Sequence, residues 1–132
     1  MLGLHDLEYI VILKVASIKR SKEFYAKKLG LKVILSDDKS HRMFKSRPQI
    51  CLDQLGSPSK YTPRHLCSGS AEIHFFSQKT IQELEYILGV QQIPIIANDK
   101  YQTEEGGEQE CIYLYDPDGN LLRITGGANP RI

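Results

Sequence analysis

The sequence lacks several features that would assign it to a functional class directly. It has no tryptophan, and its three cysteines, Cys51, Cys67 and Cys111, do not form the C-x-x-C spacing of zinc or redox motifs. Such cysteines fit a reducing compartment, in which the thiols serve as small core residues. No apolar run approaches the roughly 18 to 20 residues that cross a bilayer. The N-terminus shows no signal-peptide pattern, so we expect a cytoplasmic protein that does not bind membranes.

Charge of one sign is not in excess either. The formal net charge is +1, which argues against a nucleic-acid-binding surface and predicts no nucleic-acid partner. A basic cluster within residues 19–28 is interpreted as a solvated helix face. Gly106 and Gly107 stand among glutamates that would repel phosphate, so they do not form a phosphate-binding loop. There is also no Gly-x-Ser-x-Gly nucleophile motif.

A pattern of strand, helix and three strands occurs twice along the 132 residues. The first half predicts a helix that begins after Ser17 and ends at Gly30, and the second half predicts a helix that ends at Gly89. Ile18, Tyr25 and Leu29 give the first helix its apolar stripe, with Phe24 at the margin. The expected strands are 7–15, 31–36, 41–45, 49–54, 71–77, 94–96, 111–115 and 121–125.

The two halves predict one domain over residues 1–132, with module one at about 5–56, a linker at about 57–69 and module two at about 70–127. The stretch 55–69 is polar and contains two glycines and two prolines. The stretch 100–109 is polar as well and is expected to be a loop. Two modules of this size predict an α+β fold in which paired βαβββ units curl their sheets around a shared cavity.

The stretch Asp116-Pro117-Asp118-Gly119-Asn120 predicts a tight turn between the last two strands. This turn, together with Tyr9–Val15 and Leu29-Gly30-Leu31, resembles the vicinal oxygen chelate superfamily, the glyoxalase, bleomycin-resistance and extradiol-dioxygenase group. Residues 50–56 and 69–73 resemble a narrower branch that includes glyoxalase-domain-containing protein five. The resemblance implies a homodimer and a central cavity that binds a small molecule.

The same resemblance implies a metal held by side chains from facing strands. Its usual ligands are His or Gln on the first strand, His on the fifth and Glu on the eighth. Ile10, Glu72 and Arg123 occupy these positions, so only Glu72 can still coordinate. One carboxylate does not hold a divalent metal, and Arg123 places a permanent positive charge there. We therefore expect no metal, and our hypothesis is that Arg123 pairs with Glu72.

Strand alternation adds the other candidate residues. Lys14 shares a face with Ile10 and Ile12, and Asp53 shares one with Cys51. Lys14 and Asp53 are either ligand anchors or a salt bridge, and Tyr113 either lines a pocket or packs in the barrel. His74, on the face of Glu72 and Phe76, is either a general base or a hydrogen-bonded structural residue.

Three functions follow from these residues. The first is metal-free binding of a small, possibly anionic molecule by Arg123, Lys14 and Glu72, with Asp53 and Tyr113 nearby and apolar walls from Ile10, Ile12, Phe76 and Leu121. The second is a lyase, isomerase or dioxygenase-like enzyme that uses His74 as base or a rearranged Zn, Mn, Ni or Fe site. Donors for that site are Glu72, His74 and Asp53, with His41 or His65. The third is a dimeric interaction module with a vestigial cavity.

Overall fold

The computed structural model describes residues 4, 10–36, 40–43, 49–58 and 60–127, of which residues 33–36, 40–43 and 49 are described by their backbone alone. The chain divides into two compact units, Met1–Leu66 and Cys67–Ile132. The boundary falls inside the stretch that the sequence marks as a linker. Among the described residues, no helix has the length and apolar character to cross a bilayer.

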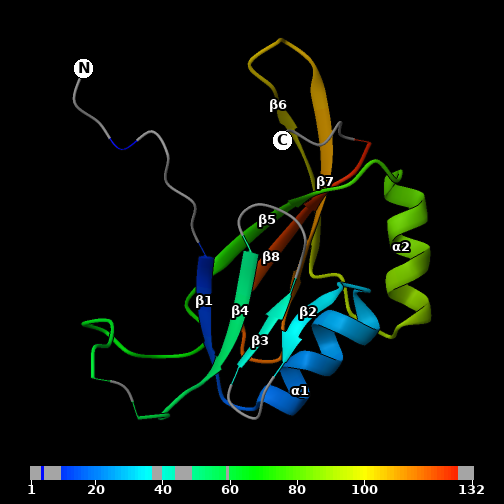
Figure 1. The fold of residues 1–132 in the computed structure, drawn as a ribbon. Coiled ribbons are helices and arrows are strands. Elements are labelled where there is room, and N and C mark those ends of the chain that lie inside the picture. The colour runs from blue at the N-terminus through cyan, green and yellow to red at the C-terminus, as the bar shows by residue number, and fades with distance from the viewer. Residues whose placement is uncertain (1–3, 5–9, 37–39, 44–48, 59, 128–132) are drawn as a thin grey trace. The chain divides into compact units, whose positions relative to one another are not determined.

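The first unit contains one helical segment and a four-stranded sheet (Figure 1). Its strands have the spatial order β1-β4-β3-β2. β1 and β4 are parallel, and the other neighbours are antiparallel. The elements follow the chain as β1 (Ile10–Val15), α1 (Ile18–Lys22), η1 (Glu23–Lys28), β2 (Val33–Ser36), β3 (Ser40–Met43) and β4 (Gln49–Gln54).

The second unit repeats this topology, with the order β5-β8-β7-β6 and a parallel pair of β5 and β8. Equivalent strands therefore occupy equivalent places in both sheets, which confirms the expected α+β fold of two βαβββ modules. Residues 7–9, 44 and 45, expected in strands, lie outside the described part. The elements are β5 (Glu72–Phe76), α2 (Ile81–Val90), β6 (Ala97–Gln102), β7 (Glu108–Tyr115) and β8 (Leu121–Thr125).

The helical segment of the first unit differs from a regular α-helix. Ser17 caps α1 as expected, because its Oγ accepts a hydrogen bond from the Arg20 backbone N–H at 3.2 Å. From Glu23 the helix widens into a π-helix, in which the Leu29 N–H donates to the Phe24 carbonyl oxygen. The wider turn buries Phe24 beside Tyr25, with the rings edge to face at 5.2 Å. Phe24 therefore belongs to the core rather than to its margin.

Helix α2 begins with a capping box, in which the Thr80 hydroxyl accepts from the Glu83 N–H and the Glu83 carboxylate accepts from the Thr80 N–H. Ile81, Leu84 and Leu88 form its buried side. The expected end at Gly89 is wrong, because Gly89 lies inside the helix and Gln92 takes the left-handed conformation, with φ at 58°. Gly30, in contrast, takes the left-handed conformation after the first helical segment as expected, with φ at 78°.

The stretch 97–109 is a β-hairpin that extends away from α2 (Figure 1). β6 pairs with β7 from Ala97 opposite Tyr113 to Gln102 opposite Glu108. The expected strand at 94–96 and the expected loop at 100–109 are therefore wrong. Backbone pairing along β7 extends the strands through polar residues, which leaves only Thr103–Gly107 as the turn, closed by the Thr103 N–H donating to the Gly107 carbonyl.

The turn before β8 is held by the side chain of Asp116, which is 5% exposed. Its Oδ1 accepts from the backbone N–H groups of Asp118 and Asn120, and its Oδ2 accepts from the Asn120 side-chain amide at 2.7 Å. Asn120 in turn accepts from the Ala71 N–H at 2.8 Å. The turn therefore fixes the start of β8 beside the start of β5, which sets the register of the residues that follow on both strands.

Candidate functional site

One face of the second sheet is packed and the other carries the candidate residues. Ile112, Leu114, Leu122 and Ile124 are buried on the packed face, and α2 packs against β7. The alternating residues form the opposite face, which we call the Arg123 face. It contains Glu72, His74 and Phe76 of β5, Leu121, Arg123 and Thr125 of β8, Cys111, Tyr113 and Tyr115 of β7, and Asp99 and Tyr101 of β6.

The expected alternation on β5 and β8 is confirmed by the register of these strands. His74 lies opposite Arg123, and Glu72 lies opposite Leu121. Arg123 is flanked on its other side by Tyr113 of β7. Adjacent strands lie about 4.8 Å apart, so His74, Arg123 and Tyr113 form one row across three strands.

Arg123 is partly buried, and its side chain is incompletely bonded. Its Nε is buried and has no hydrogen-bond partner among the described residues. None of the ion pairs in the described part of the chain involves Arg123. Its guanidinium lies over the ring of Tyr101, with Cζ 4.8 Å from the ring centroid. Arg123 thus has an aromatic neighbour, and no carboxylate of the described residues forms an ion pair with it.

Tyr101 reaches Arg123 from the hairpin because Cys111, the residue of β7 that lies between them on this face, is small. Tyr101 lies on β6, with β7 between it and β8. The Tyr101 hydroxyl lies 3.2 Å from Thr125 Oγ1, so its ring extends over β7. Cys111 and Thr125, which face each other across β7 and β8, are both buried. This contact holds the Tyr101 ring in place beneath the guanidinium.

Glu72 contacts His74 and not Arg123. Glu72 Oε2 lies 2.5 Å from His74 Nε2, and both side chains are solvent-accessible. The expected pair between Glu72 and Arg123 does not form, because the parallel register places His74, rather than Glu72, opposite Arg123. The contact orients the imidazole and leaves Nδ1 as its other hydrogen-bonding atom.

Lys14 and Asp53 lie on the sheet of the first unit. They face each other across β1 and β4, and Lys14 Nζ is 2.5 Å from Asp53 Oδ2. Their side chains are 16% and 25% exposed. Asp53 therefore balances the charge of Lys14. Ile10 and Ile12 share this face of the sheet, as expected from the alternation.

The described residues contain no group of three or more His, Cys, Asp and Glu side chains arranged to hold a metal ion. Glu72 and His74 are adjacent, Asp53 is paired with Lys14, and His65 is exposed in the segment between β4 and β5. His41 is on β3, and its side chain is outside the described part. Of the cysteines, Cys51 and Cys111 are buried as expected, whereas Cys67 is exposed in the connecting segment.

The sequence interpretation missed Tyr101 and Thr125 as neighbours of Arg123. The polar residues around Tyr101 predict a loop there, which hides its position on a strand. The only sign of a strand in this stretch is one aromatic residue between polar residues, shortly before the turn at Gly106 and Gly107. Thr125 lies two residues after Arg123 on the last predicted strand, so strand alternation places both on one face, but nothing in the sequence pairs Thr125 with Tyr101.

Known proteins share both the sequence pattern and the fold. Virulence protein STM3117 of Salmonella typhimurium is 25% identical over 115 residues, which cover 87% of this chain and 80% of that protein. The integron cassette protein VCH_CASS1 from the mobile metagenome of V. cholerae has a similar structure, with a TM-score of 0.82, 24% identity and coverage of 97% of this chain and 100% of that one.

A crystal structure of lactoylglutathione lyase from Agrobacterium tumefaciens also has a similar fold, with a TM-score of 0.70, 18% identity and coverage of 92% of this chain and 94% of that one. At these identities the structural likenesses establish the fold alone. The model of the Glyoxalase/Bleomycin resistance protein/Dioxygenase superfamily matches residues 7–124. The two βαβββ modules and this match over nearly the whole chain lead to one conclusion: the chain belongs to the Glyoxalase/Bleomycin resistance protein/Dioxygenase superfamily.

Proposed function

We propose that this protein binds a small anionic molecule on the Arg123 face, with Arg123 as the principal anchor and without a metal ion. The observation that carries the proposal is the buried Arg123 Nε, which has no partner among the described residues. A buried polar group without a hydrogen bond is costly, and more so when it carries a charge. A ligand carboxylate would bind the other N–H groups of the guanidinium and balance its charge, since guanidinium and carboxylate form bidentate pairs.

The surroundings of Arg123 support an oxyanion more than a cation or a neutral ligand. Tyr101 fixes the guanidinium by its ring face, which leaves the N–H groups in the plane of the guanidinium for oxygen acceptors. Tyr113 and His74 flank Arg123 on either side and carry further polar atoms. Glu72 is engaged with His74 rather than with Arg123, so the positive charge of Arg123 stays available to a ligand.

The residues at the superfamily's metal positions do not fit a divalent metal in this chain. Ile10 offers no donor atom, and Arg123 brings a cation to the position of a ligand. Lys14, the other basic residue we expected to bind ligand, is already paired with Asp53. We therefore assign the leading role to Arg123. The roles of Lys14 and Asp53, the homodimer and the cytoplasmic location stay predictions.

A second candidate function is metal-free proton transfer, which the contact between Glu72 and His74 favours. With Nε2 held by the Glu72 carboxylate, His74 would present Nδ1 as a general base, and Glu72 would orient the ring. His74 lies opposite Arg123 in the register, so an anion held by Arg123 would lie beside this base. Turnover that is lost in His74→Asn while ligand affinity is kept would favour this enzyme over a simple binding protein.

Binding at Arg123 is tested by titrating ¹⁵N-labelled protein with sodium acetate and following the Arg123 Nε–Hε signal at constant ionic strength. Arg123→Gln assigns that signal, and Arg64→Gln, a change at an exposed arginine of the connecting segment, serves as the matched control. We expect a saturable shift of the Arg123 signal that is retained in Arg64→Gln. Shifts no larger than those caused by sodium chloride would overturn the proposal.

A further inference from the structure

Four aromatic side chains surround Arg123 on its face of the second sheet. Tyr113 is its direct neighbour on β7, and Tyr101 lies against its guanidinium. Phe76 lies opposite Thr125, two residues along β8, and Tyr115 lies opposite Leu121, two residues the other way. Both are therefore diagonal neighbours of Arg123, at a spacing that long and aromatic side chains bridge. The whole chain has only 11 such residues, 7 Tyr and 4 Phe.

The two diagonal aromatics are largely exposed to solvent. Phe76 is 54% exposed and Tyr115 is 53% exposed, although both lie in regular strands of the sheet. Leu121, between Tyr115 and Glu72 in the register, is partly exposed as well. Exposed apolar side chains that cluster around polar anchors are typical of ligand-binding surfaces. Tyr101, in contrast, is hydrogen-bonded to Thr125, and its ring packs against the guanidinium of Arg123.

We propose that the ligand is an aryl carboxylate, with its carboxylate on Arg123 and its ring against either Phe76 or Tyr115, which lie on opposite sides of Arg123. This inference rests on the proposed anion site and adds the chemistry of the rest of the ligand. A carboxylate alone gains little at a partly exposed arginine, because water and salt screen the charge. An attached ring stacks on the aromatic side chains and covers their apolar surface. The flanking Tyr113 and His74 lie in the row of Arg123, where further polar groups on the ring would reach them.

The test compares acetate, cyclohexanecarboxylate and benzoate on the full chain, by the same titration of the Arg123 Nε–Hε signal. Cyclohexanecarboxylate matches the apolar size of benzoate but lacks its π-system. We expect benzoate to bind about tenfold more tightly than acetate, with cyclohexanecarboxylate between them. One of the two variants Phe76→Leu and Tyr115→Leu, on the side that the ring occupies, should reduce the preference for benzoate about threefold or more and leave the affinity for acetate unchanged; a loss in neither variant would overturn the aryl inference.

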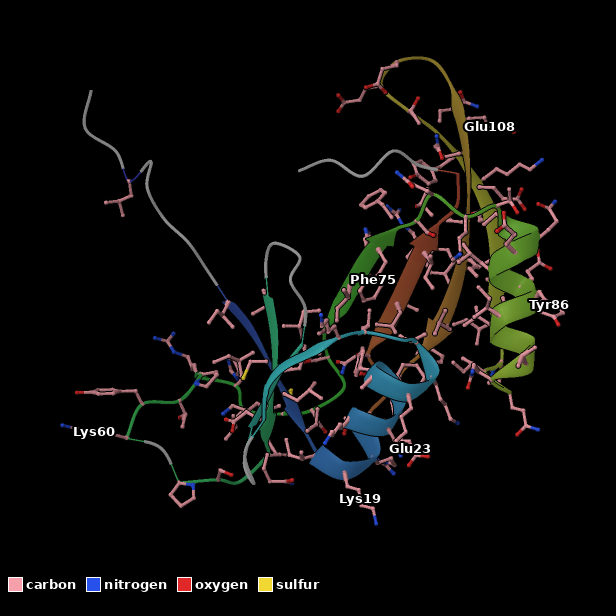
Figure 2. The ribbon with its side chains drawn as sticks, turned by 45° about the vertical axis from the view of Figure 1, so that its right-hand side comes forward. Lys19, Glu23, Lys60, Phe75, Tyr86 and Glu108 are labelled. Atoms are coloured by element: carbon pink, nitrogen blue, oxygen red, sulfur yellow. The ribbon has the colours of Figure 1, made fainter. Side chains whose placement is uncertain are left out.

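Tyr86→Leu is the matched control, since Tyr86 is 74% exposed and points outward from α2, as Figure 2 shows. It should change neither affinity. Equal binding of acetate and benzoate by the unmodified protein would overturn the aryl inference and leave the anion site intact. Binding of neither compound would overturn both proposals. In Arg123→Gln, benzoate binding is followed through the backbone amide signals of β8 in the same ¹⁵N spectra. Binding that persists unchanged there would show that the carboxylate is not recognised by Arg123, and this too would overturn both.

Discussion

The Arg123 guanidinium lies over the ring of Tyr101, with Cζ 4.8 Å from the ring centroid, and this contact depends on a hairpin that is remote in sequence from β8. Tyr101 adds a hydrogen bond to Thr125 at 3.2 Å. The ring and the hydroxyl of Tyr101 therefore contribute separately to the position of the Arg123 guanidinium. The ring holds the guanidinium through a cation–π contact, and the hydroxyl fixes the ring.

These contributions predict different effects for two substitutions of Tyr101. Tyr101→Phe should lower the free energy of unfolding by about 1 kcal/mol, because it removes only the hydrogen bond to Thr125. Tyr101→Leu should lower it by about 2 kcal/mol, because the cation–π contact is lost as well. Urea unfolding measures both. Equal losses in the two variants would show that the ring face contributes nothing.

Gly69 and Gly106 provide a matched pair for testing a close backbone approach. Both have positive φ, at 80° and 82°. A Cβ atom at Gly69 would lie 2.2 Å from the Asp118 carbonyl oxygen, whereas one at Gly106 would meet nothing within 4 Å. Gly106→Ala should therefore cost only about 1–2 kcal/mol for the left-handed conformation.

Gly69→Ala should cost about 3 kcal/mol or more, because the clash with backbone adds to the same conformational cost. Thermal or urea unfolding of both variants gives the difference between them, which isolates the close approach to the turn before β8. If both variants lose the same stability, the contact between Gly69 and Asp118 does not constrain the fold.

Arg123→Glu should raise the affinity for Zn²⁺, because it replaces a cation with a donor directly opposite His74 and beside the contact between His74 and Glu72. We expect an increase of at least about tenfold in isothermal titration, but not a complete site, since Ile10 still offers no donor. Arg64→Glu controls for the change in net charge. One tightly bound equivalent of zinc in the unmodified protein would contradict the argument.

Lys14 and Asp53 are suited to a double-mutant cycle. Their atoms are 2.5 Å apart and their side chains are 16% and 25% exposed, a burial between that of surface and core pairs. We expect a coupling energy of about 1–2 kcal/mol. The separate losses of stability in Lys14→Met and Asp53→Asn should sum to more than the loss in the double variant, and the difference is the coupling energy. Additive losses would instead mean that the pair contributes nothing to stability.

The local pattern of the sequence was sufficient to predict the repeated βαβββ modules and the positions of most strands. β4 and β8 begin and end where the alternation predicts, at Gln49–Gln54 and Leu121–Thr125. The Ser17 cap and the left-handed Gly30 were also predictable, because both follow from short-range backbone chemistry. The family follows from the same local motifs.

Elements whose residues do not follow a regular hydrophobic pattern were not predictable in this way. The strand Ala97–Gln102 is polar and exists because β7 offers it a hydrogen-bonding partner. The π-helix that buries Phe24 likewise departs from the regular period on which the prediction rested.

The sequence by itself determined which residue types each strand presents, and the resemblance to the superfamily predicts that Arg123 stands where a metal ligand is usual. Only the tertiary structure decided the partners. The parallel register of β5 and β8 places His74, not Glu72, opposite Arg123, and the hairpin brings Tyr101 to its guanidinium. Alternation reveals which face a side chain shares, but strand register and long-range pairing decide which side chains meet on it.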